Sequence, residues 1–143
     1  MLKLSKSDYD AIRKHGEEAY PNECCGVLIG KLESGDRVVK GNIRCSNGHK
    51  ETPTMRYNIP PEELIAAQKT ARDQGLDIVG FYHSHPDHAA RWSNHDLDEA
   101  HWFACSYVIT SVEQGIASRT SSYVLCGNDE QTKRFDDENI EVR

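Results

Sequence analysis

The sequence predicts one α/β domain, in which helices flank a mixed, mostly antiparallel sheet. Amphipathic helical segments alternate with short apolar runs that are bounded by glycine, proline or polar turns. At 143 residues, the chain is long enough for one hydrophobic core and too short for two typical domains. No internal repeat or low-complexity segment divides it, so we expect residues 1–143 to form a single domain.

The first third of the chain predicts a helix followed by a hairpin. Ser5 and Asp8 form a Ser-x-x-Asp start signal, and apolar residues at helical spacing continue the helix. The next run, CGVLIGKL, is short, apolar and bounded by glycine, which is typical of a strand, and a Ser-Gly-Asp turn follows it. The predicted helix covers residues 6–20, and the predicted hairpin strands cover 25–32 and 38–43.

The middle of the chain predicts a loop, a second helix and a strand. Residues 46–56 are polar and have neither the helical nor the strand period, so they predict a loop. Pro60 and Pro61 open a helix that Gly75 ends, and the segment 78–85, which is apolar as far as Tyr82, predicts a strand. The remaining predicted elements are a third helix at 94–103 and strands at 107–109 and 122–125.

Charge and cysteine content exclude several classes of function. The formal net charge is −6, and lysine and arginine are scattered without a basic stripe, which argues against nucleic acid. No secretion signal or apolar run of roughly 20 residues is present, so we expect a soluble, cytoplasmic protein with no membrane contact. The five cysteines include no C-x-x-C pair and predict neither a disulfide framework nor a four-cysteine zinc site.

Two histidines and an aspartate form the most informative pattern. His83 and His85 are two residues apart on a predicted strand, so their side chains share one face and can reach one ion. Asp96, in the first turn of the next predicted helix, is the third ligand that we assign. Zinc accepts imidazole nitrogen and carboxylate oxygen, and a catalytic zinc keeps a fourth position open for water. A purely structural zinc would fill that position.

Each part of this pattern also has a simpler interpretation. A His-x-His pair on a strand occurs in many proteins for packing reasons, and Ser93 with Asp96 fits a capping box at a helix start. The combination favours a metal, because a strand end, a proline break and a helix start bring the ligands together. The interpretations are compatible, since Ser93 can cap the helix while Asp96 binds the metal.

A hydrolytic zinc site also requires a proton acceptor that is not a ligand. Glu23 is the best candidate, because it directly precedes the CGVLIG strand, at an edge from which a carboxylate can reach the end of a neighbouring strand. This role requires the strand after Glu23 to lie next to the strand that carries the histidines.

The combined motif resembles that of the JAMM, or MPN+, metalloproteases. Glu23 is followed at a distance by His-Ser-His-Pro at 83–86, six further residues and Ser-Asn-His-Asp at 93–96. The resemblance extends over most of the chain and is weakest after Gly127. It implies a cytidine-deaminase-like fold, zinc bound by His83, His85 and Asp96, Glu23 as general base, and Ser93 as the group that steadies the oxyanion of the tetrahedral intermediate.

The chain is similar to the short bacterial and archaeal members of this family. Its Asn-Glu-Cys-Cys-Gly-Val-Leu segment at 22–28 resembles peptidases that act on ubiquitin-like sulfur carrier proteins. The resemblance implies hydrolysis after a carrier's C-terminal Gly-Gly, with release of cysteine or another residue and a link to cysteine biosynthesis. Alternatives are a deubiquitinase-like or desampylase-like protease of ubiquitin-like conjugates and a non-catalytic scaffold. The oligomeric state is open, with a homodimer as one alternative.

Other assignments for the histidines have less support. A zinc-dependent deaminase requires H-x-E followed by P-C-x-x-C, and this chain has neither. His95 and His101 are six residues apart on the predicted third helix, about 240° around its axis, so they do not predict a second metal site. His88, His95 and His101 are therefore expected to be surface residues or groups behind the ligands.

Overall fold

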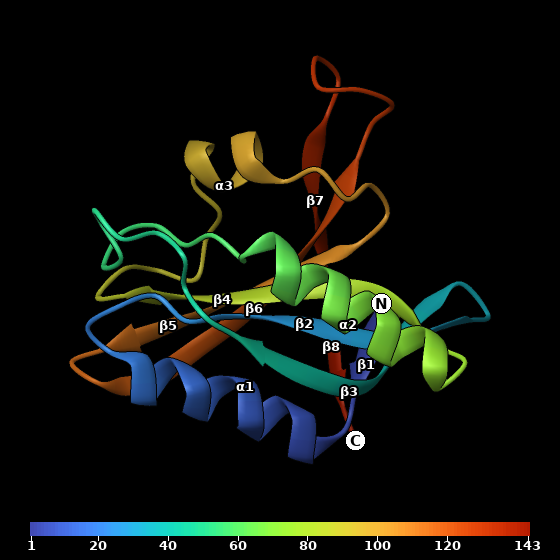
Figure 1. The fold of residues 1–143 in the computed structure, drawn as a ribbon, viewed down its shortest axis with the longest axis horizontal. Coiled ribbons are helices and arrows are strands. Elements are labelled where there is room, and N and C mark those ends of the chain that lie inside the picture. Colours follow the sequence, from blue (N-terminus) through green and yellow to red (C-terminus); the bar gives the residue numbers. More distant parts are fainter.

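The computed structural model describes residues 1–143 as an eight-stranded sheet with three helices (Figure 1). The helices are α1 (Lys6–Ala19), α2 (Pro61–Asp73) and α3 (Asn94–Glu99). The strands are β1 (Leu2–Leu4), β2 (Cys25–Glu33), β3 (Asp36–Cys45), β4 (Asp77–Pro86), β5 (Ser106–Glu113), β6 (Ile116–Cys126), β7 (Arg134–Glu138) and β8 (Ile140–Val142).

The sheet is mixed, as the sequence predicts. Its strand order is β7-β6-β5-β4-β2-β3-β1-β8. The four pairs β2·β3, β2·β4, β5·β6 and β6·β7 are antiparallel, whereas β4·β5, β1·β3 and β1·β8 are parallel. The strand that carries the histidines, β4, is therefore central, with β2 on one side and β5 on the other.

Helices α1 and α2 cover opposite faces of the sheet (Figure 1). Alternate residues of β2 enter two different cores, because successive side chains of a strand point to opposite faces. Leu28 packs in the cluster that contains Ile12 of α1, whereas Val27 and Ile29 belong to the cluster that contains Ala67 of α2. Burial on both faces explains why CGVLIG is an unbroken apolar run.

Helix α3 is shorter than the sequence predicts, since it ends at Glu99 rather than at Phe103. Its last turn contains no basic residue to favour the helix dipole. Ala100 leaves the helix in an extended conformation with its side chain buried, and the Trp102 N–H donates to the Tyr107 hydroxyl at 3.1 Å. Packing of residues 100–102 onto the sheet therefore replaces the last predicted helical turn.

Three short strands, β1, β7 and β8, were not predicted. They contain three to five residues each and lack a long apolar run. Strand β7 pairs with β6 at one end of the sheet, and β8 pairs with β1 at the other. Only Asn139 separates β7 from β8, so one C-terminal segment supplies both outermost strands. Such strands depend on pairing with distant segments rather than on local sequence.

A buried ion pair anchors this C-terminal segment. Glu138 accepts hydrogen bonds from Arg37 at 2.5 Å and 3.1 Å, from Ser106 at 2.6 Å and from Ser122 at 2.8 Å. Its side chain is only 2% exposed. Strands β3, β5, β6 and β7 thus meet at one carboxylate.

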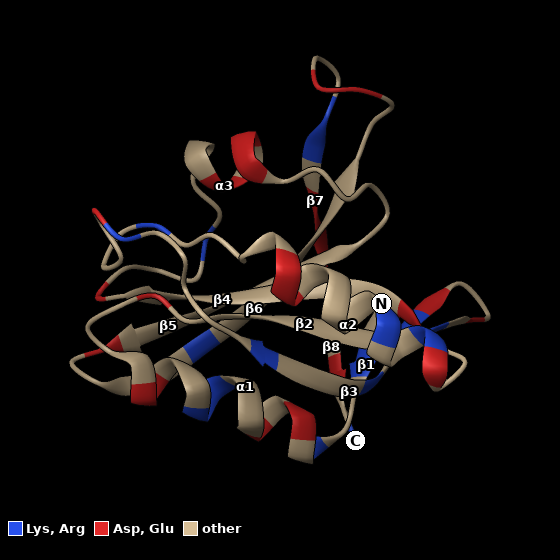
Figure 2. Cartoon of the chain, in the orientation of Figure 1, with Lys and Arg blue, Asp and Glu red and all other residues tan.

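Charged residues are interspersed over the molecule. Acidic and basic positions alternate along α1 and along the loops above the sheet in Figure 2. None of the helices combines the length and the apolar character needed to cross a bilayer.

Candidate active site

The register of β2 and β4 places Glu23 beside the histidine strand. Cys25 lies opposite His83 in this antiparallel pair, so the chain just before β2 passes the end of β4. Ser84 extends the pairing: its hydroxyl accepts a hydrogen bond from the Cys24 N–H at 2.8 Å, and its own N–H donates to the Cys24 carbonyl at 3.3 Å. The strand adjacency that the proposed role of Glu23 requires is therefore present.

His83, His85 and Asp96 come together at the end of β4. The Nε2 atoms of the two histidines are 3.2 Å apart. His83 Nε2 lies 3.3 Å from Asp96 Oδ1, and His85 Nε2 lies 3.1 Å from Asp96 Oδ2. The three residues form a compact cluster, with one ligand atom from each within 4.8 Å of the others, which we call the ligand triad.

Contacts behind the ligand triad fix the orientation of each group. His85 Nδ1 is 2.9 Å from the Ala89 carbonyl, so it carries the hydrogen and leaves the Nε2 lone pair facing the triad. The His83 ring stacks on Tyr57 with centroids 4.4 Å apart. Asp96 is held by the capping box of α3, in which the Ser93 N–H donates to Asp96 Oδ2 at 2.9 Å.

The spacing of the triad fits a tetrahedral metal ion. Zinc binds nitrogen and oxygen ligands at about 2.0–2.2 Å, which separates neighbouring ligand atoms by about 3.3 Å in a tetrahedral site. The observed pairwise separations are 3.1–3.3 Å, with Asp96 meeting His83 through Oδ1 and His85 through Oδ2. Two imidazoles and one carboxylate also form a donor set that zinc accepts, whereas magnesium and calcium prefer oxygen ligands alone.

The electrostatics of the triad favour a bound cation. Burial acts to raise the pKa of Asp96, but hydrogen bonds from His83 and His85 hold that pKa well below its usual range. Burial lowers the pKa of His83 and keeps its imidazole neutral. Burial also acts against protonation of His85, yet its bonds to Asp96 and Ala89 outweigh this effect and raise its pKa.

Glu23 is a buried carboxyl group without a protein partner. Its residue is 5% exposed, and its Oε1 atom makes no hydrogen bond. Burial raises the pKa of Glu23 to about 8, and the nearby Asp96 carboxylate contributes in the same direction. A buried carboxyl group that has no hydrogen-bond or ion-pair partner in the protein is typical of a group with a chemical role.

One cavity is lined by residues of the triad, and a second lies on the other side of Tyr57, which stacks on His83. The first, which we call the polar cavity because most of its lining residues are polar or charged, has a volume of about 380 Å³ and opens beside Glu23. It is lined by Glu23, His85, Ser93 and Asp96 together with Met55, Arg56, His88, Ala89, Arg91 and His95. The five candidate site residues thus lie together, four of them on this cavity and His83 directly behind them.

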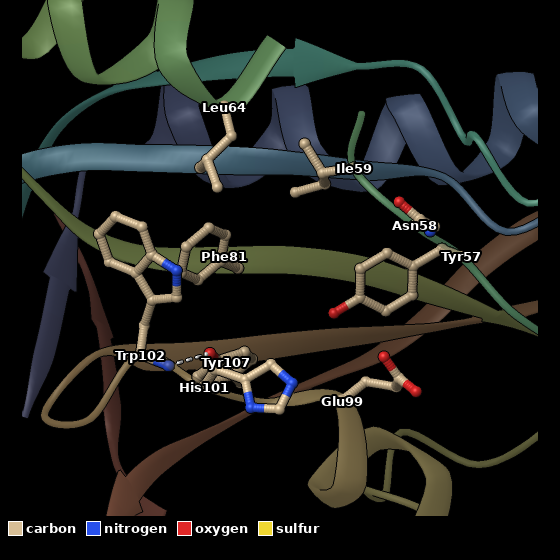
Figure 3. A pocket seen from close by; sticks show the side chains of 9 residues that line it. All are labelled: Tyr57, Asn58, Ile59, Leu64, Phe81, Glu99, His101, Trp102 and Tyr107. Atoms are coloured by element: carbon tan, nitrogen blue, oxygen red, sulfur yellow. Dashed lines mark hydrogen bonds between the residues drawn. The ribbon is translucent and has the colours of Figure 1, made fainter. Parts of the chain in front are cut away.

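The second cavity is mostly apolar and has a volume of about 240 Å³. Figure 3 shows Phe81 and Trp102 on one side of it and Tyr57 on the other, with the Tyr57 hydroxyl directed into the cavity. Leu64 and Ile59 close it from the side of α2. Tyr57 also stacks on His83, so the Tyr57 ring lies between this apolar cavity and the ligand triad.

Several residues that shape the site carried no signal in the sequence. Ser84 was noticed only as the residue between two histidines, although it points to the other face and bonds the backbone next to Glu23. Asn47 and Tyr57 belong to the predicted loop and its extension. Their positions depend on the path of that loop over β2, which local spacing does not reveal.

The remaining histidines differ in part from expectation. His101 lies beyond the end of α3, so the predicted placement of His95 and His101 on one helix was wrong. His101 instead pairs with Glu130 at 2.8 Å. His88 and His95 line the polar cavity without belonging to the triad. No second cluster of metal-binding side chains is present.

The chain is similar in sequence to several known proteins. The sequence matches the family of prokaryotic homologs of the JAB domain over residues 5–125. A desampylase of Haloferax volcanii is 36% identical over 114 residues, which cover 77% of this chain and 80% of that protein. A probable TtuB-protein conjugate cleaving protease of Thermus thermophilus is 33% identical over 102 residues, which cover 71% and 65% respectively.

A solved structure confirms the predicted fold. The crystal structure of a JAB1/MPN domain protein from Archaeoglobus fulgidus matches with a TM-score of 0.61. The match covers 98% of this chain and 97% of the other at 18% sequence identity, so the likeness concerns the fold alone.

Proposed function

The chain belongs to the prokaryotic homologs of the JAB domain, within the JAMM or MPN+ family, and on this premise we propose that it is a zinc metallopeptidase. Its proposed reaction is hydrolysis of the bond after the C-terminal Gly-Gly of a ubiquitin-like or sulfur carrier protein. The observation that carries the proposal is the meeting of the ligand triad, Glu23 and Ser93 at one cavity.

Zinc is the metal that we propose for the triad. His83 and His85 would bind it through Nε2 and Asp96 through its carboxylate, in agreement with their 3.1–3.3 Å separations. A zinc ion held there would act as a Lewis acid and would make water nucleophilic near neutral pH.

Glu23 is the proposed general base. Glu23 lines the same cavity as His85 and Asp96 and its Oε1 atom has no partner, so its carboxylate can accept a proton from an attacking water and pass it to the leaving amine. Burial makes this carboxylate more basic than an exposed one. A positive charge at the triad favours the ionised form, so the group is available as a base at neutral pH.

Ser93 is the proposed stabiliser of the oxyanion. Its Oγ accepts a hydrogen bond from the Asp96 N–H at 3.1 Å, which leaves the hydroxyl hydrogen free to donate. Because the capping box fixes Ser93 next to a triad ligand, this donor is oriented before substrate binds.

The recessed position of the triad supports a substrate with small residues at the scissile bond. The side chains of His83, His85 and Asp96 are 1%, 10% and 9% exposed. A carbonyl group can approach them closely when its own residue is glycine, which has no Cβ to collide with the cavity walls. The apolar cavity beside Tyr57 offers a place for an apolar side chain further back in the same tail.

The relatives support the coarser part of the proposal, a protease of ubiquitin-like protein conjugates. One is named a desampylase and another a probable protein-conjugate cleaving protease. The five cysteines are all free, which agrees with the proposed location in the reducing cytoplasm. Release of cysteine from a sulfur carrier would link the enzyme to cysteine biosynthesis.

The test is hydrolysis of a defined substrate. A ubiquitin-like carrier that bears one extra residue after its C-terminal Gly-Gly is incubated with zinc-loaded protein, and the product is weighed by intact-protein mass spectrometry. We expect loss of the single residue, no reaction after chelation and recovery when zinc is returned. Cleavage of unfolded peptides at unrelated sites with equal ease, or no cleavage by the zinc-loaded protein, would contradict the proposal.

A further inference from the structure

We propose that Arg56 and Arg91 form a carboxylate-binding subsite for the leaving group. The enzyme would then prefer substrates in which a single amino acid with a free α-carboxylate follows the scissile bond, over conjugates linked to a lysine side chain. This inference rests on the proposed function and specifies the substrate class of the same site.

The two arginines line the same polar cavity as the proposed base. Both are surface residues, and the cavity between them contains Glu23, Ser93 and Asp96. They come from different loops, one between β3 and α2 and one between β4 and α3, and Figure 2 shows basic positions in both loops. A ligand at the mouth of the cavity would therefore meet a guanidinium group from each loop.

The backbone of Arg56 is connected to Glu23 through one side chain. Asn47 Nδ2 donates to the carbonyl of Arg56 at 3.0 Å and to the carbonyl of Glu23 at 3.2 Å. The Glu23 N–H also donates to the Pro53 carbonyl at 2.7 Å, and the Arg56 N–H donates to Thr52 at 3.0 Å. The loop that carries Arg56 is thereby held against the residue that would protonate the leaving amine.

The backbone of Arg91 is connected to His85 in a similar manner. The Arg91 N–H donates to the Ala89 carbonyl at 2.8 Å, and the same carbonyl is 2.9 Å from His85 Nδ1. One carbonyl therefore orients a proposed metal ligand and fixes the start of the Arg91 side chain. The two arginines are each positioned relative to the reacting groups.

Neither guanidinium group has a partner within the protein. Arg37 and Arg44 each pair with a carboxylate, whereas Arg56 and Arg91 make no side-chain hydrogen bond or ion pair. The only carboxyl groups that line their cavity are those of Glu23, which is buried, and Asp96, whose side chain is 9% exposed, and both belong to the proposed reaction site. Planar guanidinium groups bind carboxylates through paired, charge-assisted hydrogen bonds, so an anionic ligand is the natural partner.

The chemistry of the leaving group decides between the two substrate classes. In a carrier that bears one C-terminal amino acid, the α-carboxylate is separated from the leaving nitrogen by the α-carbon alone. It therefore remains close to Glu23, in the cavity that the arginines border. In a lysine-linked conjugate, the leaving nitrogen ends a four-carbon side chain, and the α-carboxyl of that lysine is part of the target's backbone and carries no charge.

The test compares matched substrates that differ only in this charge. Carriers ending in Gly-Gly-alanine and in Gly-Gly-alaninamide are hydrolysed by the zinc-loaded protein, with a Gly-Gly conjugate of a lysine ε-amine as a third substrate. We expect kcat/KM for the free acid to exceed that of the amide and of the conjugate by about 10- to 100-fold, as a charged hydrogen bond predicts. Similar values for acid and amide, or preference for the lysine conjugate, would overturn the subsite.

Variants assign the effect to the two residues. Arg56→Gln and Arg91→Gln should reduce kcat/KM for the acid and leave the amide almost unchanged, with normal zinc content and thermal unfolding. Arg119→Gln, an exposed arginine on β6 outside the cavity, should affect neither substrate. Equal losses with acid and amide would refute a carboxylate contact.

A binding measurement separates this inference from the proposed function. Glu23→Gln protein binds the uncleaved acid and amide carriers in calorimetric titrations, and the acid should bind more tightly only while Arg56 and Arg91 are present. Equal affinities overturn the subsite even if the wild-type enzyme is active. Failure of the wild-type protein to hydrolyse any of the three substrates overturns the proposed function, and the inference with it.

Discussion

The hydroxyl of Ser84 accepts a hydrogen bond at 2.8 Å from the backbone N–H of Cys24. The residue between the two histidines therefore holds the residue that follows Glu23. Both Ser84 and Cys24 are buried, so this bond fixes the proposed base relative to the ligand triad with no competition from water.

Ser84→Ala should reduce activity without removing the metal. The substitution leaves the buried Cys24 N–H without its acceptor, which should lower the free energy of unfolding by about 1–3 kcal/mol. The kcat value should fall because Glu23 is held less firmly, while zinc content stays the same. Chemical denaturation, metal analysis and kinetics measure the three quantities. Ser121→Ala on β6 is the control, and an equal loss of kcat there would contradict the positioning role.

Glu23→Gln and Asp96→Asn should separate a base from a ligand. Glutamine keeps the size of Glu23 but cannot accept a proton, so the rate should fall by about 10²–10⁴ with zinc retained. Asp96→Asn removes a charged ligand and should weaken zinc binding directly. Elemental analysis and kinetics distinguish the two. Loss of zinc in Glu23→Gln would make Glu23 a ligand, and nearly full activity would place the base elsewhere, with His88 as the next candidate.

Zinc affinity should fall as the pH is lowered. The pKa of His85 is raised above its usual 6.5, so below that raised value the imidazole holds a proton that a metal must displace. Affinity should be nearly constant above the pKa of His85 and should fall by about tenfold for each pH unit below it. Chelator competition at several pH values measures this. Calorimetry in buffers of different ionisation enthalpy measures the protons that zinc binding releases below the pKa of His85. Zinc binding without proton release at such a pH would refute the prediction.

Glu138→Ala should destabilise the protein far more than loss of an exposed ion pair. The Arg37 guanidinium is 13% exposed and would remain without its carboxylate, so the free energy of unfolding should fall by about 3–5 kcal/mol. Urea denaturation measures the change. Asp136→Ala removes the carboxylate of the exposed Arg134–Asp136 pair and should have little effect. Similar behaviour of the two variants would show that the buried pair contributes little.

The parts of the site that the sequence predicts are those encoded by short spacings. His83 and His85 share a face because a strand alternates, and Ser93 and Asp96 share a helix start because a capping box spans four residues. Glu23 could be connected to them only through a known motif, because its position depends on the register of β2 against β4. Arg56 and Arg91 gave no signal, since two loops that are 35 residues apart meet only in the folded chain.

The elements of the fold also divide into those that local sequence predicts and those that depend on distant partners. The longer strands and the first two helices were predicted from their apolar period. The prediction of a last turn in the third helix was wrong, because Trp102 packs onto β5 instead. Strands β7 and β8 are too short and polar to be recognised without their partners.

The two outermost strands also determine how another chain can bind. A long exposed edge strand would invite an extended peptide to add itself to the sheet. Here those edges are β7 and β8, which have five and three residues and come from one bent segment. These short strands cover only part of their neighbours, so β3 beyond Val38 and β6 before Ser122 have no strand on their outer side. The extended substrate tail that we propose would therefore obtain its backbone hydrogen bonds either from these parts of β3 and β6 or from the loops around the ligand triad.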